Sequence, residues 1–249
     1  MFAVSSLTFF MLCMDTLTRI KLRLLARAEK AVLPLQLTKK ESRTFLNAFD
    51  LSFEEHRNAP CRASGEIYFM HIFRQLMKMI SLMVRFQVKS IDLLVSILLH
   101  DAIENVKENG TTQFMVVSKI TALFNEKITY FVLCLTKNKA RETRDGYLIR
   151  LTFCAEWQPL IAKPGDSTDN MITLSATPLA SQAGKVKEIF THFPAMKARA
   201  IHLITLEGKS GRLKGWKRWI GLVEVLHRNL HRNAKKQQRR LEGLGIEVL

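Results

Sequence analysis

Apolar residues recur at helical spacing along most of the chain. In the first such segment Leu17, Ile20 and Leu24 lie three or four positions apart, basic residues fall between them, and Pro34 follows the segment. This spacing places side chains on one face of a helix. The same pattern predicts helices over residues 15–33, 39–53, 66–86, 90–106, 112–123, 126–136, 147–157 and 185–202.

Composition strengthens the helical interpretation and predicts an all-α fold. Hydrophobic residues make up 47% of the 249 residues, while Gly and Pro number only 11 and 6. Straight-chain residues lose little rotamer freedom in a helix, and a chain of this length can bury one substantial core plus an appendage. Residues 91–99 are almost wholly apolar, which indicates a helix that is buried on all sides.

The opening segment, residues 1–14, is apolar, with no positive charge before the apolar run and no small-residue cleavage site. Its run of about a dozen apolar residues is shorter than the ~20 that a membrane span needs. We interpret it as packing on the domain or as an extension upstream of a start at Met14, with a signal-like segment as the alternative. The four scattered cysteines fit free thiols in a reducing compartment, so we predict a cytoplasmic protein.

Positive charge is concentrated near the C-terminus. The net charge is +16, and residues 207–240 alone hold eleven Lys or Arg and two Glu. The apolar residues of this segment recur at helical spacing: Trp216, Ile220, Val223, Leu226 and Leu230. The pattern predicts a basic amphipathic helix, which can contact RNA or an anionic membrane surface, or dock on the domain. Two tryptophans favour docking with the basic side outward.

Three ordered motifs carry the candidate chemistry. Residues 62–71 are Arg-Ala-Ser-Gly-Glu-Ile-Tyr-Phe-Met-His, residues 98–105 are Leu-Leu-His-Asp-Ala-Ile-Glu-Asn, and residues 161–171 are Ile-Ala-Lys-Pro-Gly-Asp-Ser-Thr-Asp-Asn-Met. They resemble the RKSGEPYxxHP, LLHDxxED and IKLADRLHNM motifs of RelA/SpoT-family HD-domain hydrolases. Thr136-Lys137 resembles the short TK element between the last two. The resemblance covers roughly residues 40 to 200.

The resemblance implies an HD-domain helical bundle that removes the 3′-pyrophosphate of (p)ppGpp, giving GDP or GTP and pyrophosphate. A guanosine polyphosphate nucleotide is therefore the expected ligand. Carried over residue by residue, the family pattern gives four metal ligands: His71, His100, Asp101 and Asp166. Two imidazoles and two carboxylates suit Mn²⁺ or a similar divalent ion.

The resemblance also implies catalytic and substrate-binding residues. Glu104 lies one helical turn beyond His100, where it can orient the attacking water or move its proton. Asn105 occupies the adjoining catalytic position. Three residues are expected on the substrate side: Arg62, Lys163 and Asn170. The Arg62 guanidinium can contact phosphate with two donors or stack on a purine, whereas a structural role is the alternative for Lys163.

Four positions depart from the family pattern: Ala63 replaces a lysine, Asn105 an aspartate and Asp169 a histidine, and Pro164 lies in the third motif. An amide at Asn105 cannot act as a base. Because proline costs ~3 kcal/mol in a helix interior, the helix carrying Asp166 is predicted to begin late, with Pro164 in its first turn. Two alternatives stay open: a weak or inactive nucleotide-binding regulatory protein, and an HD phosphohydrolase of another nucleotide.

The predicted organisation has three parts. Residues 1–38 form an apolar and helical lead, residues 39–206 the HD phosphohydrolase domain, and residues 207–249 a basic amphipathic tail. The synthetase domain of the family is not expected in this chain, since residues 207–249 have a basic helical pattern rather than an α/β one.

Overall fold

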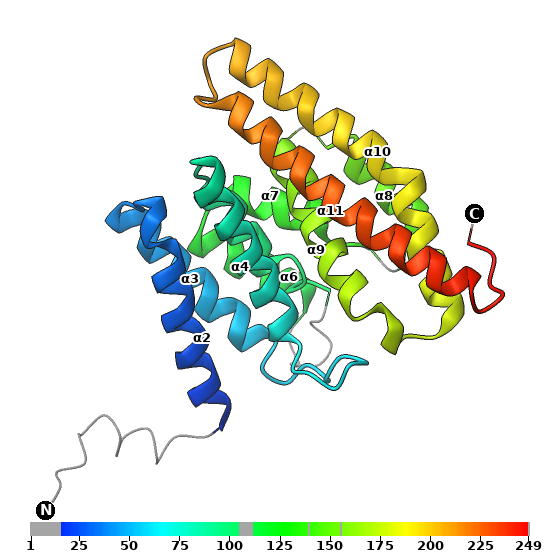
Figure 1. Ribbon diagram of the computed structural model, residues 1–249. Helices are drawn as coiled ribbons and strands as arrows, with labels where there is room; N and C mark the ends of the chain where they lie inside the picture. The colour runs from blue at the N-terminus through cyan, green and yellow to red at the C-terminus, as the bar shows by residue number, and fades with distance from the viewer. Residues whose placement is uncertain (1–15, 105–111, 139, 155, 249) are drawn as a thin grey trace, which may run out of the picture.

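Helices form the regular secondary structure of the chain. The computed structural model describes residues 16–104, 112–138, 140–154 and 156–248, so the apolar segment 1–14 and Asn105 lie outside the described residues. Within these ranges the all-α prediction is confirmed, with ten α-helices and no strand (Figure 1). The α-helices are α2 (Thr16–Val32), α3 (Lys39–Glu55), α4 (Phe69–Phe86), α5 (Ile91–Leu99), α6 (Gln113–Leu123), α7 (Glu126–Leu135), α8 (Arg144–Thr152), α9 (Trp157–Ile172), α10 (Leu179–Lys209) and α11 (Trp216–Glu242).

Side-chain caps fix where several of these helices begin. The Thr38 hydroxyl accepts a hydrogen bond from the Glu41 backbone N–H, and the Glu41 carboxylate accepts one from the Thr38 backbone N–H. This reciprocal capping box starts α3. Ser90 and Asn125 cap the first turns of α5 and α7 with single side-chain acceptors. Each cap satisfies a backbone donor that has no partner within the helix.

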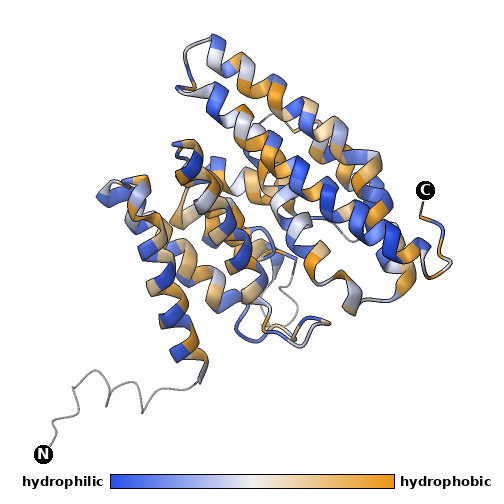
Figure 2. Ribbon diagram, in the orientation of Figure 1, coloured by the Kyte–Doolittle hydropathy of each residue, from blue (hydrophilic) through white to orange (hydrophobic). Residues whose placement is uncertain are grey.

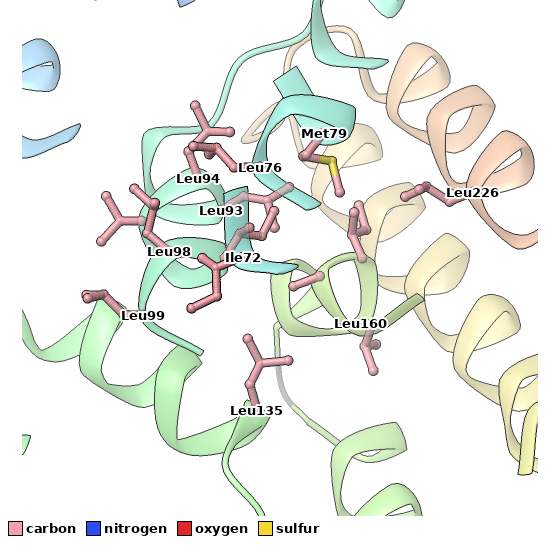
Figure 3. Packing of buried hydrophobic residues seen from close by; sticks show 14 of the residues in the cluster. Ile72, Leu76, Met79, Leu93, Leu94, Leu98, Leu99, Leu135, Leu160 and Leu226 are labelled. Atoms are coloured by element: carbon pink, nitrogen blue, oxygen red, sulfur yellow. The ribbon is translucent and has the colours of Figure 1, made fainter. Parts of the chain in front are cut away.

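Helix α5 lies at the centre of the core. It packs against α3, α4, α7 and α9, as expected for a helix that is apolar on every side. Figure 3 shows buried side chains of the hydrophobic core that come from several of these helices and from α11: Ile72, Leu76 and Met79 of α4, Leu93, Leu94, Leu98 and Leu99 of α5, Leu135 of α7, Leu160 of α9 and Leu226 of α11. Burial of each such side chain contributes about 1.5–3 kcal/mol, so the end of α5 is firmly positioned.

Helix α5 is shorter than predicted. The helix expected over residues 90–106 ends at Leu99, and residues 100–104 form turns. Here the Ala102 N–H donates to the Leu99 carbonyl at 3.0 Å, and the Glu104 N–H donates to the Asp101 carbonyl at 3.1 Å. These hydrogen bonds reach back three residues, in place of the four of an α-helix. His100 and Asp101 therefore lie directly after the C-terminal end of a buried helix.

Helix α9 begins earlier than predicted. It runs from Trp157 to Ile172 with Pro164 inside, so the expectation of a late start near Pro164 is wrong. Proline supplies no N–H to the Leu160 carbonyl, but neighbouring backbone groups are supported by side chains. Gln75 of α4 donates to the Ala162 carbonyl at 3.0 Å, and Thr168 donates to the Pro164 carbonyl at 2.6 Å. Burial of almost the whole helix offsets the remaining cost of Pro164.

Helices α10 and α11 form a helical hairpin along one side of the molecule (Figure 1). Helix α10 extends well beyond the predicted 185–202, so the boundary expected at residue 206 falls inside it. Helix α11 packs on α10, α9 and α4, and its Trp219 ring lies 4.7 Å from the Trp157 ring. The tail is therefore docked, with hydrophilic residues outward (Figure 2). None of the described helices combines the length and apolar character that a membrane crossing requires.

Candidate metal centre

His71 of α4 and Asp166 of α9 face each other across a buried contact. The Nε2 atom of His71 lies 3.0 Å from Oδ1 of Asp166, and both side chains are less than one-tenth exposed. The other ring nitrogen of His71, Nδ1, lies 2.7 Å from Oδ2 of Asp169. A carboxylate on Nδ1 fixes the ring orientation and directs Nε2 toward Asp166.

His100 and Asp101 enter the same space from the end of α5. Nε2 of His100 lies 3.3 Å from Oδ2 of Asp101 and 3.8 Å from Oδ1 of Asp166. Nδ1 of His100 lies 2.8 Å from the Ile97 carbonyl oxygen, which orients this ring as Asp169 orients His71. The Tyr68 hydroxyl donates to Oδ2 of Asp101 at 2.9 Å. Each of the two imidazoles thus presents Nε2 to a common point.

These side chains form a group that can hold a metal ion. His71, His100 and Asp101 each offer one ligand atom, and the three atoms lie within 4.8 Å of one another. Asp166, the fourth predicted ligand, is not part of this group of three, although its Oδ1 lies within 4 Å of both Nε2 atoms. Within the described residues, Nε2 of His100 makes no hydrogen bond of good geometry although it is buried. A buried nitrogen without such a bond, facing carboxylates, fits a metal ligand. We call these four residues the metal centre.

The electrostatics of the metal centre favour positive charge. Burial lowers the pKa of His100, but the Asp101 and Asp166 carboxylates outweigh it and raise this pKa to about 9. Burial also lowers the pKa of His71, but the Asp166 and Asp169 carboxylates outweigh this effect and raise the pKa above its ordinary value. Burial opposes ionisation of Asp166, yet Lys163 and the two imidazoles hold its pKa well below the usual value. Surroundings that stabilise positive charge on two buried imidazoles also favour a bound cation.

Asp169 organises a second set of contacts, which the sequence motifs did not identify. It accepts hydrogen bonds from Arg74 Nε at 2.7 Å and Nη2 at 2.8 Å, beside its contact with His71. Arg74 also pairs with Glu66. Burial raises the pKa of Asp169, but His71 and Arg74 lower it to about 2, so the carboxylate stays ionised. The signal in the sequence is spacing: Asp169 is three residues after Asp166, and Arg74 three after His71.

The residues predicted for substrate binding surround Asp166. Asn170 donates to Oδ1 of Asp166 at 2.7 Å and accepts from Arg62 Nη2 at 2.6 Å. Lys163 is buried, and its ammonium pairs with Oδ2 of Asp166 and lies 5.5 Å from the centroid of the Tyr147 ring. Arg62 and Asn170 are thus together at the metal centre, whereas Lys163 has the contacts of a structural support for Asp166.

Of the two predicted catalytic residues, only Glu104 lies within the described residues. Glu104 lies in the turn after α5, and its Oε1 accepts a hydrogen bond from the Lys137 backbone N–H at 2.7 Å. It does not belong to the group of converging ligand atoms formed by the described residues. Asn105 lies outside the described residues. The Glu104 contact links the second motif to the Thr136-Lys137 element.

Comparison with known proteins adds no assignment to this geometry. No protein-family model matches the chain, and no curated protein sequence matches it. The buried group of His71, His100 and Asp101, which can hold a metal ion, is what the structure itself establishes about the site.

Proposed function

We propose that this chain is a metal-dependent phosphohydrolase that removes the 3′-pyrophosphate of (p)ppGpp. One observation carries the proposal: the ligand atoms of His71, His100 and Asp101, from two separate sequence motifs, converge, and Asp166 of the third motif lies within 4 Å of both imidazoles. These are the residues on which the resemblance to the RelA/SpoT-family hydrolases rests. A cytoplasmic guanosine polyphosphate is the substrate that this resemblance implies.

The donor set supports Mn²⁺ as the ion. His71 and His100 offer imidazole nitrogens, Asp101 and Asp166 offer carboxylate oxygens, and this mixture suits a divalent ion of intermediate hardness. The outer contacts of both histidines leave only Nε2 directed inward. When bound, such an ion lowers the pKa of a coordinated water and polarises a phosphoryl oxygen.

The remaining chemistry is assigned to side chains of this chain. Arg62 and Asn170 bind the substrate phosphate and ribose, since they are held together beside Asp166. The Glu104 carboxylate accepts the proton of the attacking water. Water oxygen then bonds to the phosphorus attached to the 3′ oxygen, that phosphorus–oxygen bond breaks, and the 3′ oxygen takes up a proton. The products are GDP or GTP and pyrophosphate.

A turnover assay with the full chain tests the proposal. With Mn²⁺ and ppGpp, chromatography should detect GDP and pyrophosphate, and chelation or His100→Ala should abolish both. His192→Ala is the matched control, because His192 also pairs with an aspartate, Asp145, but lies on α10, which carries none of the four ligands. Equal manganese content in wild type and His100→Ala would overturn the metal centre.

A regulatory nucleotide-binding role is the second candidate. It is favoured by Asn105, which lacks the carboxylate of the family pattern. Saturable binding of ppGpp without product in the same assay would support this role. Turnover of a different nucleotide in place of ppGpp would support the third interpretation, an HD phosphohydrolase of another substrate.

A further inference from the structure

We propose that the outer side of α11 binds the phosphate backbone of a double-stranded nucleic acid. This surface, which we call the basic face, consists of Arg228, Arg232, Lys235, Lys236, Arg239 and Arg240. Residues 225–241 contain no Asp or Glu, so the face carries six positive charges without an acidic residue among them.

The basic face points outward because the other side of α11 is built into the core. Trp219, Leu222, Leu226 and Leu230 are each at most 2% exposed and pack toward α9 and α10. All six cationic side chains are exposed, and the hydropathy colouring of α11 shows the hydrophilic residues on its outer side (Figure 2). The helix is therefore a rigid support that presents cations in a fixed arrangement.

The cations of the basic face lack acidic partners. None of the six forms an ion pair with a carboxylate in the described part of the chain, whereas Lys197 and Glu224, further along the same hairpin, pair at 2.6 Å. Like charges four residues apart, such as Arg232 and Lys236, repel each other on a helix. A polyanion laid along the face would relieve this repulsion.

The face has the shape and length for a run of phosphates. Arg228 and Arg239 are eleven residues apart, which corresponds to about 16 Å of helix. A surface groove of about 450 Å³ follows this length, and its lining is entirely basic or histidine: Arg228, His231, Arg232, Lys235, Lys236 and Arg239. A smaller groove shares Lys236 and reaches Met171 at the end of α9.

Two features favour a duplex over the other polyanions. Membrane-surface helices insert an apolar side among lipids, but the apolar side of α11 is buried, and residues 225–241 include no exposed large hydrophobic side chain. Single-stranded nucleic acids are bound by aromatic side chains that stack on bases. Residues 225–241, which carry the basic face, include no Phe, Tyr or Trp. Of the polyanions considered, this leaves a duplex, bound through its phosphate backbone without regard to base sequence.

Fluorescence anisotropy of 24-base-pair RNA and DNA duplexes with the full chain tests the proposal. For five phosphate contacts the slope of log K against log salt is about −4.5, so affinity should fall about 500-fold between 50 and 200 mM salt. A quadruple variant of the face should weaken binding at least 100-fold and flatten the slope to about −1. Its substitutions are Arg232→Gln, Lys235→Gln, Lys236→Gln and Arg239→Gln.

A matched control variant distinguishes the effect of the basic face from the effect of the protein's net charge. It removes four exposed cations of α2 and α3, which lie across the molecule from α11 (Figure 1), through Arg23→Gln, Lys30→Gln, Lys39→Gln and Arg43→Gln. This variant should keep wild-type affinity within about threefold. Equal weakening in both variants, or no duplex binding at 50 mM salt, would overturn the proposal.

Two further measurements complete the test. Sedimentation with phosphatidylserine vesicles examines the membrane alternative, and vesicle binding that depends on the face without duplex binding would replace our proposal. Preference between the RNA and DNA duplexes identifies the source of the phosphates. Manganese content and ppGpp turnover should be unchanged in both quadruple variants, so failure here is distinguishable from failure of the proposed hydrolase.

Discussion

Asp169→Asn tests whether the contacts behind His71 govern metal binding. The substitution keeps the size of a buried side chain but removes the charge that faces Nδ1 of His71 at 2.7 Å and the two donors of Arg74. Carboxylates that orient a ligating histidine change metal affinity by about 10–100-fold when lost, equivalent to about 1.4–2.7 kcal/mol. We therefore expect the Kd for Mn²⁺ to rise by that factor.

Calorimetric titration of Mn²⁺ into the full chain at pH 7.5 measures this effect. Asp145→Asn is the control, since Asp145 also faces a histidine, at 2.9 Å, but its side chain is 76% exposed and lies on α8, which carries none of the four ligands. The pKa of Asp169 is held at about 2, so Asp169→Asn should also lose about 2 kcal/mol of stability, and circular dichroism must first verify folding. A folded Asp169→Asn protein with a Kd within twofold of wild type would refute the reasoning.

Three further predictions address substrate binding, packing and pH. Arg62→Ala should raise the KM for ppGpp about 10–100-fold, because a charged hydrogen bond contributes about 1.5–3 kcal/mol. Its effect on Mn²⁺ affinity in titration should be smaller than that of Asp169→Asn, because Arg62 contacts Asp169 at 3.4 Å but contacts neither histidine. Trp219→Ala should lower the free energy of unfolding in urea by about 3–5 kcal/mol, whereas the partly exposed Trp216→Ala should lower it less. Burial and nearby Lys197 lower the pKa of His227 to about 4. As the pH falls below 6.5, His227 therefore takes up a proton in the unfolded chain before it does so in the folded protein, and stability is lost. The free energy of unfolding should fall by about 2 kcal/mol between pH 7 and 5. In His227→Gln, urea denaturation should show a free energy of unfolding that changes less with pH.

The helical fold was predictable because its signal is local. Spacing of apolar residues on α3, α4 and α7 depends only on neighbours within two turns, and these helices lie where that pattern predicts. The ends depend on tertiary contacts. Gln75 of α4 supports the backbone beside Pro164, and nothing near Pro164 in sequence indicates this partner. The extension of α10 through Pro194 to Lys209 likewise accompanies packing on α11.

The candidate site likewise contains residues that could be predicted from the sequence and residues that could not. His71, His100 and Asp101 were identified from the resemblance, and the structure brings their ligand atoms together. Arg74 and Asp169 were not, because their pairing joins α4 to α9 and becomes visible only when these helices are packed. Spacing of three residues from a ligand marks many helical positions, so without the tertiary structure it cannot select these two.

The four residues of the metal centre come from α4, the end of α5 and α9, which are distant along the chain and adjacent only when folded. A cation held by all of them would act as a non-covalent cross-link between three segments of the bundle. The unfolded chain cannot present the same set of ligands, so binding would select the native state. At a free Mn²⁺ concentration one hundred times Kd, this linkage stabilises the fold by about 2.7 kcal/mol. The melting temperature would then report on the metal centre without any substrate.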